Sequence, residues 1–538
     1  MLDTRQTTSG PHPETDTHAV ENQPGARGDL DLWAEDPALR AHGLTADGDH
    51  LALYGRKIGR AAMRDAAAEA DRQPPRPRLF DAGGRRLDEL SYHPGYHDVM
   101  QAALGSGIAA LPWEGAVGGH STHAAMIYMT AQIAPGQCGA LMSTYAAIPA
   151  LRAAPPLFDL WVPKLTARLH DPALRPVGVK AAATVSLALT EKQGGAPVTR
   201  AQRDGEHYRL RGHKWACTAP MSDGLIVLAQ APGGPTAFLV PRWLEGTRNM
   251  VHIQRLKDMM GQRASGVAEI ELADAIAYPL GAEGDGAASL APIMQHLRLG
   301  AGIAPVGLMR AALATAWHWC GERRSGGARL VELPLMRGVL ADLALEWEGA
   351  LALAMAAASA FDEPTEQGRA FARIGSALAL HQSARLCPGV VQEAMDCLGV
   401  IGPTEESGMP LLLREAAATS LWEGTGNTLC LEILRILREA PVTGQVLGDI
   451  LGSVTGGSRA YDAALRAHMA RFPRLPEEAQ ARWYVESLAS LLTSAILIAQ
   501  GPSAIADAYV ATRLGDARGR SYGAIEGVDI DAILARIG

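Results

Sequence analysis

The sequence predicts an α+β protein in which two helical regions flank a β-rich segment, followed by a helical tail. Apolar residues recur at three- and four-residue spacing before about residue 180 and again after about residue 290, which indicates helices. Between these regions apolar and polar residues alternate, as they do in strands. The continuous alternation of strands and helices typical of a Rossmann fold is absent.

Composition and charge narrow the class of protein. The chain has 538 residues, of which 48% are hydrophobic and 20% charged, so it is globular with a large core. Its 57 acidic and 49 basic residues give a net charge of −8, which argues against a general nucleic-acid binder. The six cysteines form no C-x-x-C pair and are expected to be core thiols.

The first 180 residues are expected to be an arm and a helical domain. Residues 1–30 are polar and rich in Pro, Thr and Gly, which predicts a loosely ordered arm. In the N-terminal helical domain, residues 31–180, helical periodicity covers 97–104, 122–133 and 146–165, with Pro155-Pro156 at a helix junction.

Residues 181–288 are expected to form the central β domain. Residues 207–211 and 267–272 alternate, and the apolar runs 225–229 and 238–240 flank an Ala-Pro-Gly-Gly-Pro turn, a hairpin pattern.

The remaining chain is predicted to be helical. Residues 289–440 form an antiparallel bundle with helices over 303–320, 333–361 and 369–386, and the extension 441–538 holds two or three further helices after residue 455. The most apolar run, 349–361, is shorter than the roughly 20 residues that span a bilayer. With no apolar leader at the N-terminus, a cytoplasmic location is expected.

Two turns in the β domain are candidate ligand contacts. In 187–195 an apolar strand runs into Thr190 and two glycines, so backbone N–H groups are available to a planar or anionic ligand. In 212–220, Trp215 offers a ring for stacking and Thr218 a hydroxyl. Without any ligand, the first segment could be an ordinary β-turn and the second a strand with a core tryptophan.

The third candidate is the segment 420–427, Ser-Leu-Trp-Glu-Gly-Thr-Gly-Asn. Glu423 lies between an aromatic residue and a glycine. In an apolar pocket the pKa of its carboxyl would rise, and it would then suit a general base. The alternative is an acid that favours a helix N-terminus through the helix dipole.

Other patterns in the sequence give weaker evidence of function. Arg323-Arg324, followed by Ser-Gly-Gly, fits either a phosphate clamp or a solvated basic turn. The pairs His93/His97 and His120/His123 have helical spacing but no accompanying carboxylate, so no metal site is predicted. Motifs of serine hydrolases, P-loop NTPases and zincins are absent.

The order of these motifs resembles the acyl-CoA dehydrogenase family, and most closely its AidB-like branch, the adaptive alkylation-response proteins. The matching segments run along nearly the whole chain: 18–24, 84–86, 93–97, 112–113, 190–195, 212–215, 253–258, 334–337, 339–343, 405–407, 422–424, 504–508 and 513–514. The resemblance implies a helical domain, a β-barrel-like domain and a helical bundle, with an extra C-terminal helical domain.

The resemblance also implies FAD as cofactor and Glu423 as the catalytic base that removes the α-proton of an acyl thioester. Arg323 would reach the FAD pyrophosphate across a subunit interface, and Gly399 and Val400 would support the ADP part, which implies a homo-oligomer, taken as a homotetramer. The cofactor-binding residues that it implies are Leu187, Leu189, Thr190, Gly195, Ala196, Ala216, Cys217, Thr218, Arg323, Gly399, Val400, Trp422, Gly424, Thr425 and Asn427.

The chain departs from the family pattern at four places near the implied cofactor. Ala196-Pro197 replaces a usual Ser-Asp, and Ala216 stands where an aromatic residue is usual. Gly326 replaces a Phe, and Val400 replaces the second glycine of a pair. These changes indicate a reshaped or weakened FAD site.

Three functions therefore remain open. The first is an FAD-dependent oxidoreductase acting on an acyl thioester or a related small molecule. The second is a flavin-dependent monooxygenase-like enzyme, suggested by the space beside Ala216. The third is a DNA-associated protective protein, in which Arg435 and Arg438 would face DNA. Residues 441–538 hold nine Arg, no Lys and ten acidic residues, a charge that disfavours this third function.

Overall fold

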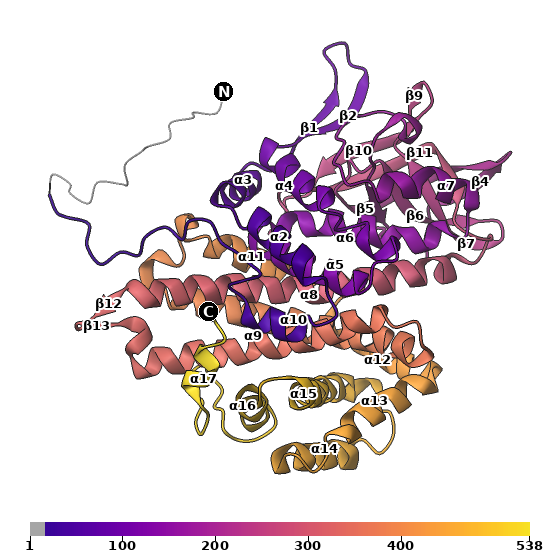
Figure 1. Ribbon diagram of the computed structural model, residues 1–538. Coiled ribbons are helices and arrows are strands. Elements are labelled where there is room, and N and C mark those ends of the chain that lie inside the picture. The colour runs from indigo at the N-terminus through magenta and orange to yellow at the C-terminus, as the bar shows by residue number, and fades with distance from the viewer. Residues whose placement is uncertain (1–16) are drawn as a thin grey trace.

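Three long helices run side by side through the middle of the protein (Figure 1): α8 (Gly286–Glu322), α9 (Pro334–Phe361) and α10 (Glu366–Asp396). The structure is a computed structural model that describes residues 17–538. The N-terminal helices and the β domain lie on one side of the three helices, and the C-terminal helices lie on the other. The predicted α+β class and the order of helices, strands and helices are confirmed.

The N-terminal region is mostly helical, as predicted. Its helices are α1 (Pro37–His42), α2 (Gly48–Ile58), α3 (Ala61–Arg72), α4 (Pro94–Gly105), α5 (Gly119–Ile133), α6 (Pro135–Leu151) and α7 (Pro155–Leu165). Pro155 starts α7, which confirms the predicted junction. Residues 1–16 of the expected arm lie outside the described residues, and 17–30 contain no helix.

One hairpin in this region is absent from the sequence prediction. Strands β1 (Arg76–Phe80) and β2 (Arg86–Ser91) pair antiparallel and are rich in charged residues; β1 is largely exposed, whereas β2 buries Asp88 and Leu90. Because neither strand presents an alternating apolar face, periodicity does not reveal them.

The β domain closes into a barrel-like ring. Its strands are β3 (Val185–Ala188), β4 (Arg200–Asp204), β5 (His207–Thr218), β6 (Gly224–Ala231), β7 (Gly234–Pro241), β8 (Trp243–Leu244), β9 (Thr247–Arg248), β10 (Val251–Leu256) and β11 (Val267–Pro279). The ring runs β11-β5-β4-β6-β7, and β7 pairs again with β11. The predicted hairpin is β6–β7, and β11 contains the predicted strand 267–272. The ring encloses its own core around Leu210, Phe238 and Ile270.

The bundle helices agree with the predicted ones, and α9 contains the apolar run 349–361. Helix α8 is long and apolar enough to cross a membrane by length and composition, but 89% of its most apolar stretch is buried inside the protein. Burial on all sides explains why α8 is apolar around its whole circumference.

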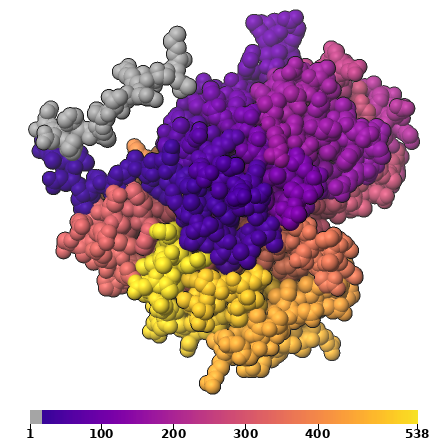
Figure 2. Space-filling view, viewed as in Figure 1, coloured from indigo at the N-terminus to yellow at the C-terminus, as the bar shows by residue number. Residues whose placement is uncertain are grey.

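Residues 441–538 are mostly helical (Figure 2, orange to yellow) and cover the face of α9 and α10 away from the β domain. The helices that follow α10 are α11 (Met409–Thr419), α12 (Gly426–Glu439), α13 (Pro441–Ser453), α14 (Arg459–Arg471), α15 (Ala481–Gln500), α16 (Ser503–Arg513) and α17 (Ile530–Leu534). Of these, α11 lies on the opposite side and packs against α6 and α8. Four helices follow residue 455 rather than two or three, because α17 is too short to show a helical period. All six cysteines are buried and unpaired, as predicted.

Ion pairs fix the extension to α9. The fully buried carboxylate of Asp342 accepts a hydrogen bond from Arg513 at 2.6 Å, and Glu348 accepts one from Arg536 at 2.7 Å. At Gly349, a Cβ would stand only 2.3 Å from the ring of Tyr509, so α9 and α16 approach as closely as a glycine allows.

Candidate active site

Glu423 lies in the turn that joins α11 to α12. Thr425 caps α12 by accepting a hydrogen bond from the backbone N–H of Thr428, so the helix starts three residues after Glu423. Gly424, at φ +101°, makes the reversal that a side chain would resist. Trp422 packs between α8, α10 and α12, against Ala301 and Leu429. The turn is therefore anchored by an aromatic residue on one side and a helix cap on the other.

The carboxylate of Glu423 has an unusual environment. Its Oε2 is buried, and no group among residues 17–538 hydrogen-bonds that atom. Burial raises the pKa of Glu423 to about 8, although the positive charge of Arg298 opposes the rise. Arg298 is held by a hydrogen bond to Glu432 at 3.1 Å, and its own Nε is buried without a partner. A buried acid with a pKa near neutrality and a free oxygen is suited to accept a proton from a ligand.

The two predicted turns of the β domain meet at one edge of the ring. The backbone N–H of Trp215 donates to the carbonyl of Thr190 at 2.8 Å, which joins the end of β3 to β5. The hydroxyl of Ser186 donates to the carbonyl of Thr218, a second link between these strands. Thr190 is exposed there, while Leu187, Leu189, Ala216 and Thr218 are half-buried and Cys217 is fully buried.

Two other residues of these motifs hold the turns rigid. The buried carboxylate of Glu191 accepts hydrogen bonds from Lys214 at 2.5 Å, from the Thr199 hydroxyl and from the Val198 N–H. Burial works against ionisation, yet these bonds lower the pKa of Glu191 to about 2. Glu191 and Lys214 therefore form a structural ion pair that the sequence analysis did not identify, because burial is not visible in a motif.

The glycine turn itself is open. Gly194 and Gly195 both have φ of +67°, and a Cβ on either would meet nothing within 4 Å. Ala196, which replaces a serine of the family pattern, is exposed. The Gly194 N–H donates to the carbonyl of Glu191 at 3.1 Å, so the turn closes on itself while the space beside its two glycines stays open to a ligand.

Helix α6 packs between the strand edge and the part of α8 that also contacts Trp422. A Cβ on Gly139 would lie 3.3 Å from the methyl group of Thr218, and Met142, one turn further along, contacts Gly300 beside Ala301 of α8. Ala301 in turn contacts Trp422. The amide of Gln137 on the same helix has a buried Nε2 that no described residue hydrogen-bonds. The strand edge therefore contacts α6 directly, and the Glu423 turn is linked to α6 through the Gly300–Ala301 segment of α8.

A second buried acid lies next to this region. Glu415 accepts the backbone N–H of Gln262 at 2.7 Å, and its other oxygen, Oε2, is buried without a partner among the described residues. Burial raises the pKa of Glu415 to about 8. Gln262 is held at φ +58° and its side chain lies 3.5 Å from the hydroxyl of Thr218. Sequence reasoning missed Glu415, Gln262 and Arg298, since none stands in a motif near a candidate.

The start of α12 is surrounded by positive charge. Arg482 donates to the side chain of Asn427 at 2.7 Å, and Arg385 donates to the carbonyl of Ser420 at 2.9 Å. Both guanidinium groups lie close to Gly426, so cations and the free N–H groups of the helix start coincide. This combination favours a phosphate group.

Three predicted residues lie elsewhere. Arg323 is the last residue before the short hairpin β12 (Arg324–Ser325) and β13 (Ala328–Arg329), at the far end of α8. Arg298 and Arg323 are separated by 25 residues of helix, or roughly 37 Å at 1.5 Å per residue. Gly399 and Val400 belong to a short turn at the same far end, where Val400 is 93% exposed. Within one chain, Arg323 is too far from Glu423 to bind the same cofactor molecule.

The structure gives no support to metal binding among its described residues, where no group of three metal-ligating side chains occurs. His93 caps α4 by accepting the Gly95 N–H, and His120 contacts the hydroxyl of Tyr145 at 2.7 Å. Arg435 of the proposed DNA-binding pair is occupied by Glu432 and Glu439, at 2.8 and 2.7 Å.

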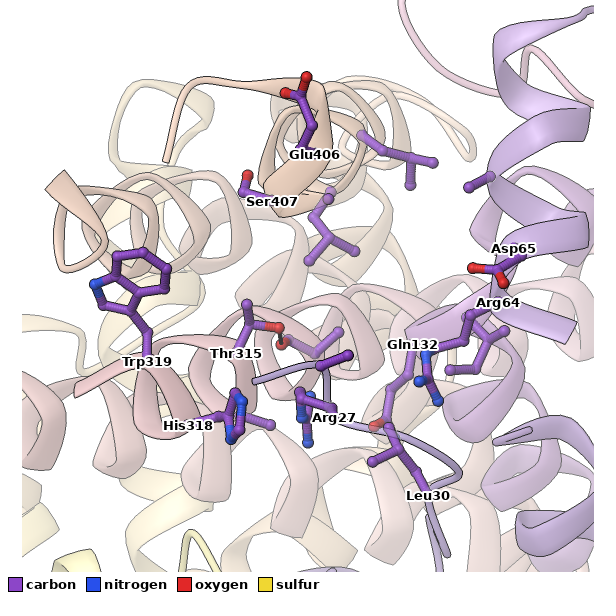
Figure 3. Close-up of a pocket in the computed structure, with 18 of the residues that line it drawn as sticks. Arg27, Leu30, Arg64, Asp65, Gln132, Thr315, His318, Trp319, Glu406 and Ser407 are labelled. Carbon is purple, nitrogen blue, oxygen red and sulfur yellow. Dashed lines mark hydrogen bonds between the residues drawn. The ribbon is translucent and has the colours of Figure 1, made fainter. Parts of the chain in front are cut away.

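A large cavity lies away from the Glu423 turn, between the N-terminal arm and the far half of α8 (Figure 3). It has a volume of about 540 Å³, and Arg27, Gln132, His318, Trp319 and Ser407 are among its lining residues. None of the predicted catalytic or cofactor-binding residues lines this cavity, although Pro24 and residues 405–407 of the segments that match the family do.

Comparison with known proteins agrees with this arrangement. Residues 22–172 match the adaptive response protein AidB N-terminal domain, residues 186–275 the acyl-CoA dehydrogenase middle domain and residues 284–437 the acyl-CoA dehydrogenase C-terminal domain. These matches define an oxidoreductase of the acyl-CoA dehydrogenase class, whose members are FAD flavoproteins.

Individual relatives are also similar over most of the chain. The putative acyl-CoA dehydrogenase AidB of Escherichia coli is 36% identical over 477 residues, which is 86% of this chain and 88% of that protein. Acyl-CoA dehydrogenase family member 11 of Caenorhabditis elegans is 26% identical over 77% of this chain and 71% of its own length. The structure of Caenorhabditis elegans ACDH-11 in complex with C11-CoA shares the fold, with a TM-score of 0.83, 24% identity and 96% of each chain covered. The chain belongs to the AidB-like branch of the acyl-CoA dehydrogenase family.

Proposed function

We propose that this enzyme binds FAD between the β3–β5 edge and the Glu423 turn, and that Glu423 is the base in the α,β-dehydrogenation of an acyl thioester. The observation that carries the proposal is the buried, unpartnered Oε2 of Glu423 beside Arg298. The complex of a relative with C11-CoA supports an acyl-CoA as the substrate class.

The residues present fit a flavin dinucleotide. Leu187, Leu189, Ala216 and Thr218 offer an apolar edge with one hydroxyl, and the open Gly194–Gly195 turn leaves space for a ligand beside its backbone. The cationic start of α12, with Thr425 and Asn427, suits a phosphate. The small Ala216 and the exposed Ala196 remove two contacts, so we expect binding that is weaker than a fully formed site would give.

The chain's own groups perform the proton transfer. Oε2 of Glu423 accepts the α-proton of the thioester, which requires the carboxylate form. Arg298 stabilises that form, while burial keeps the carboxylate poorly solvated and therefore basic. FAD, when bound, supplies the acceptor for the hydride that leaves the β-carbon. Trp422 shields this region from solvent on the side of α10 and α12.

The distant position of Arg323 supports a homo-oligomer in which one subunit completes the cofactor site of another. Arg323, Gly399 and Val400 lie at an exposed end of the molecule, and a cofactor that extends from a second subunit would meet them there. A homotetramer would provide such contacts, in agreement with the expectation from the family.

The proposal is tested by anaerobic stopped-flow reduction of the FAD-loaded enzyme with a series of acyl-CoA substrates. Glu423→Gln keeps the shape of the side chain and removes the base, so flavin bleaching should fall by at least about a thousandfold. Glu439→Gln, a change of an exposed acid on α12, is the matched control and should leave the rate unchanged. Normal bleaching in Glu423→Gln would refute the base assignment.

The small side chain of Ala216 favours one alternative, a monooxygenase-like reaction in the space beside the flavin. The same enzyme, reduced and then mixed with oxygen, distinguishes the two reactions. Rapid oxygen consumption coupled to an oxygenated product would support the alternative, and slow reoxidation without such a product would support dehydrogenation.

A further inference from the structure

The N-terminal arm is fastened to the end of α8 by a compact set of polar contacts. The side-chain amide of Asn22 bonds Arg324 in both directions, accepting its backbone N–H at 2.7 Å and donating to its carbonyl at 3.0 Å. The N–H of Gly25 donates to Glu322 at 3.0 Å, and the ring of His318 bonds the carbonyl of Gly25 at 2.8 Å.

The same arm also holds Arg323. The guanidinium Nη1 of Arg323 donates to the backbone carbonyl of Asn22 at 2.5 Å. The guanidinium lies 5.8 Å from the centre of the Trp319 ring, so the arm and the ring confine it from two sides. The other two guanidinium nitrogens of Arg323 make no hydrogen bond to any of residues 17–538, which leaves them for a ligand.

Hydrophobic burial does not explain why the arm lies here. Residues 17–23 are all exposed, including Val20 at 46%. Asn22 adopts φ +56°, a conformation that asparagine accepts more readily than most residues. Directed hydrogen bonds rather than apolar contacts therefore hold residues 22–25 against the end of α8. Arg27 and Leu30 of the same arm also line the cavity of Figure 3, next to His318 and Trp319.

We propose that Asn22 is a positioning residue, which holds the end of α8 and the Arg323 guanidinium in the orientation that binds the phosphates of FAD from a neighbouring subunit. The inference rests on the proposed function, because it assigns FAD to this chain. It adds the N-terminal arm to the cofactor site, although no residue of the arm needs to touch the cofactor.

A double-mutant cycle on FAD affinity tests this role. Asn22→Gly removes the amide and keeps the left-handed backbone accessible, so its carbonyl remains in the chain. The dissociation constant of FAD is measured by quenching of flavin fluorescence on titration into the apoprotein. We expect Asn22→Gly to weaken binding about five- to tenfold, while Gln23→Ala, a change of the neighbouring exposed amide, leaves it unchanged.

The cycle is completed in an Arg323→Ala background, where Asn22→Gly should cause no further loss. An unchanged dissociation constant in Asn22→Gly, or an equal loss with and without Arg323, would overturn the inference. Thermal unfolding of each apoprotein checks that the fold persists. If the wild-type protein itself bound no FAD, the proposed function would fail, whereas wild-type binding with an unaffected Asn22→Gly variant would remove only the role of Asn22.

Discussion

Two opposing influences act on the carboxyl group of Glu423, the proposed base. Burial raises its pKa to about 8, and the charge of Arg298 limits that rise. Since the base acts as a carboxylate, the rate of flavin reduction should increase with pH up to about 8. In Arg298→Gln the pKa of Glu423 rises further, so the same limb should move upward by about one pH unit.

The matched control for this change is Arg435→Gln. Arg435 pairs with the same Glu432 that holds Arg298, but it lies on the surface. The pH dependence of anaerobic bleaching should be that of the wild type in Arg435→Gln and displaced in Arg298→Gln. An undisplaced profile in Arg298→Gln would show that Arg298 does not govern the charge of Glu423.

Glu415 predicts a pH dependence of stability. The pKa of this acid is about 8 in the folded protein and ordinary in the unfolded chain, so the folded state holds the extra proton. The stabilising contribution is therefore complete below about pH 4.5 and is lost as pH rises to about 8, by up to roughly 4 kcal/mol. Glu415→Gln should flatten the fall in the free energy of unfolding between pH 5 and 9, as measured by urea denaturation. An equally steep fall would show that Glu415 does not retain its proton.

The sequence alone draws attention to some of these residues, and only the structure identifies the others. Glu423 could be predicted because its chemistry is suggested by its immediate neighbours, Trp422 and Gly424. Arg298 lies 125 positions away, in a helix whose sequence shows only an apolar pattern. Its contact with Glu432 and its proximity to Glu423 are seen only in the folded structure. Glu191 and Lys214 were visible in motifs, but their ion pair depends on burial that no local pattern contains.

At the scale of elements, the contact between α9 and α16 predicts a sensitive position. Gly349→Ala would place a Cβ 2.3 Å from the Tyr509 ring, so the helices must separate or the ring must move. We expect a loss of about 1–3 kcal/mol in unfolding free energy and faster proteolysis after residue 440. Gly448→Ala on α13 is the control, because its Cβ meets nothing within 4 Å. That variant should gain up to about 1 kcal/mol, and similar losses in both would contradict close packing at Gly349.

The elements that were predictable share a physical property. Long helices such as α9 and paired strands such as β6 and β7 bury an apolar face, and the regular spacing of apolar residues in the sequence indicates that face. The β1–β2 hairpin is rich in charged residues and lacks an alternating apolar face, and α17 has five residues, so neither carries a periodic signal. The closure of the ring between β7 and β11 depends on pairing between distant segments, which periodicity does not specify.

For the whole molecule, the distance along α8 is the strongest constraint on function. The proposed base, Glu423, lies near Arg298 in the first half of α8, whereas Arg323 directly follows the last residue of that helix. Residues far apart in one chain act on one cofactor only if a second chain brings them together. The proposed activity and the oligomeric state are therefore linked, and a change at the far end of α8 should affect both.

Val400 offers the test of that link. It is 93% exposed in the single chain, at the end of the molecule where Arg323 would meet a cofactor from another subunit. Val400→Asp puts a charge into such a contact, so it should lower the mass measured by size-exclusion chromatography with light scattering and weaken FAD binding at least about tenfold. Val117→Asp changes an equally exposed valine, 94% accessible, in the N-terminal region and should alter neither quantity. A wild-type protein that is monomeric and still binds FAD stoichiometrically would show that each subunit holds its cofactor alone, and Arg323 would then have no part in FAD binding.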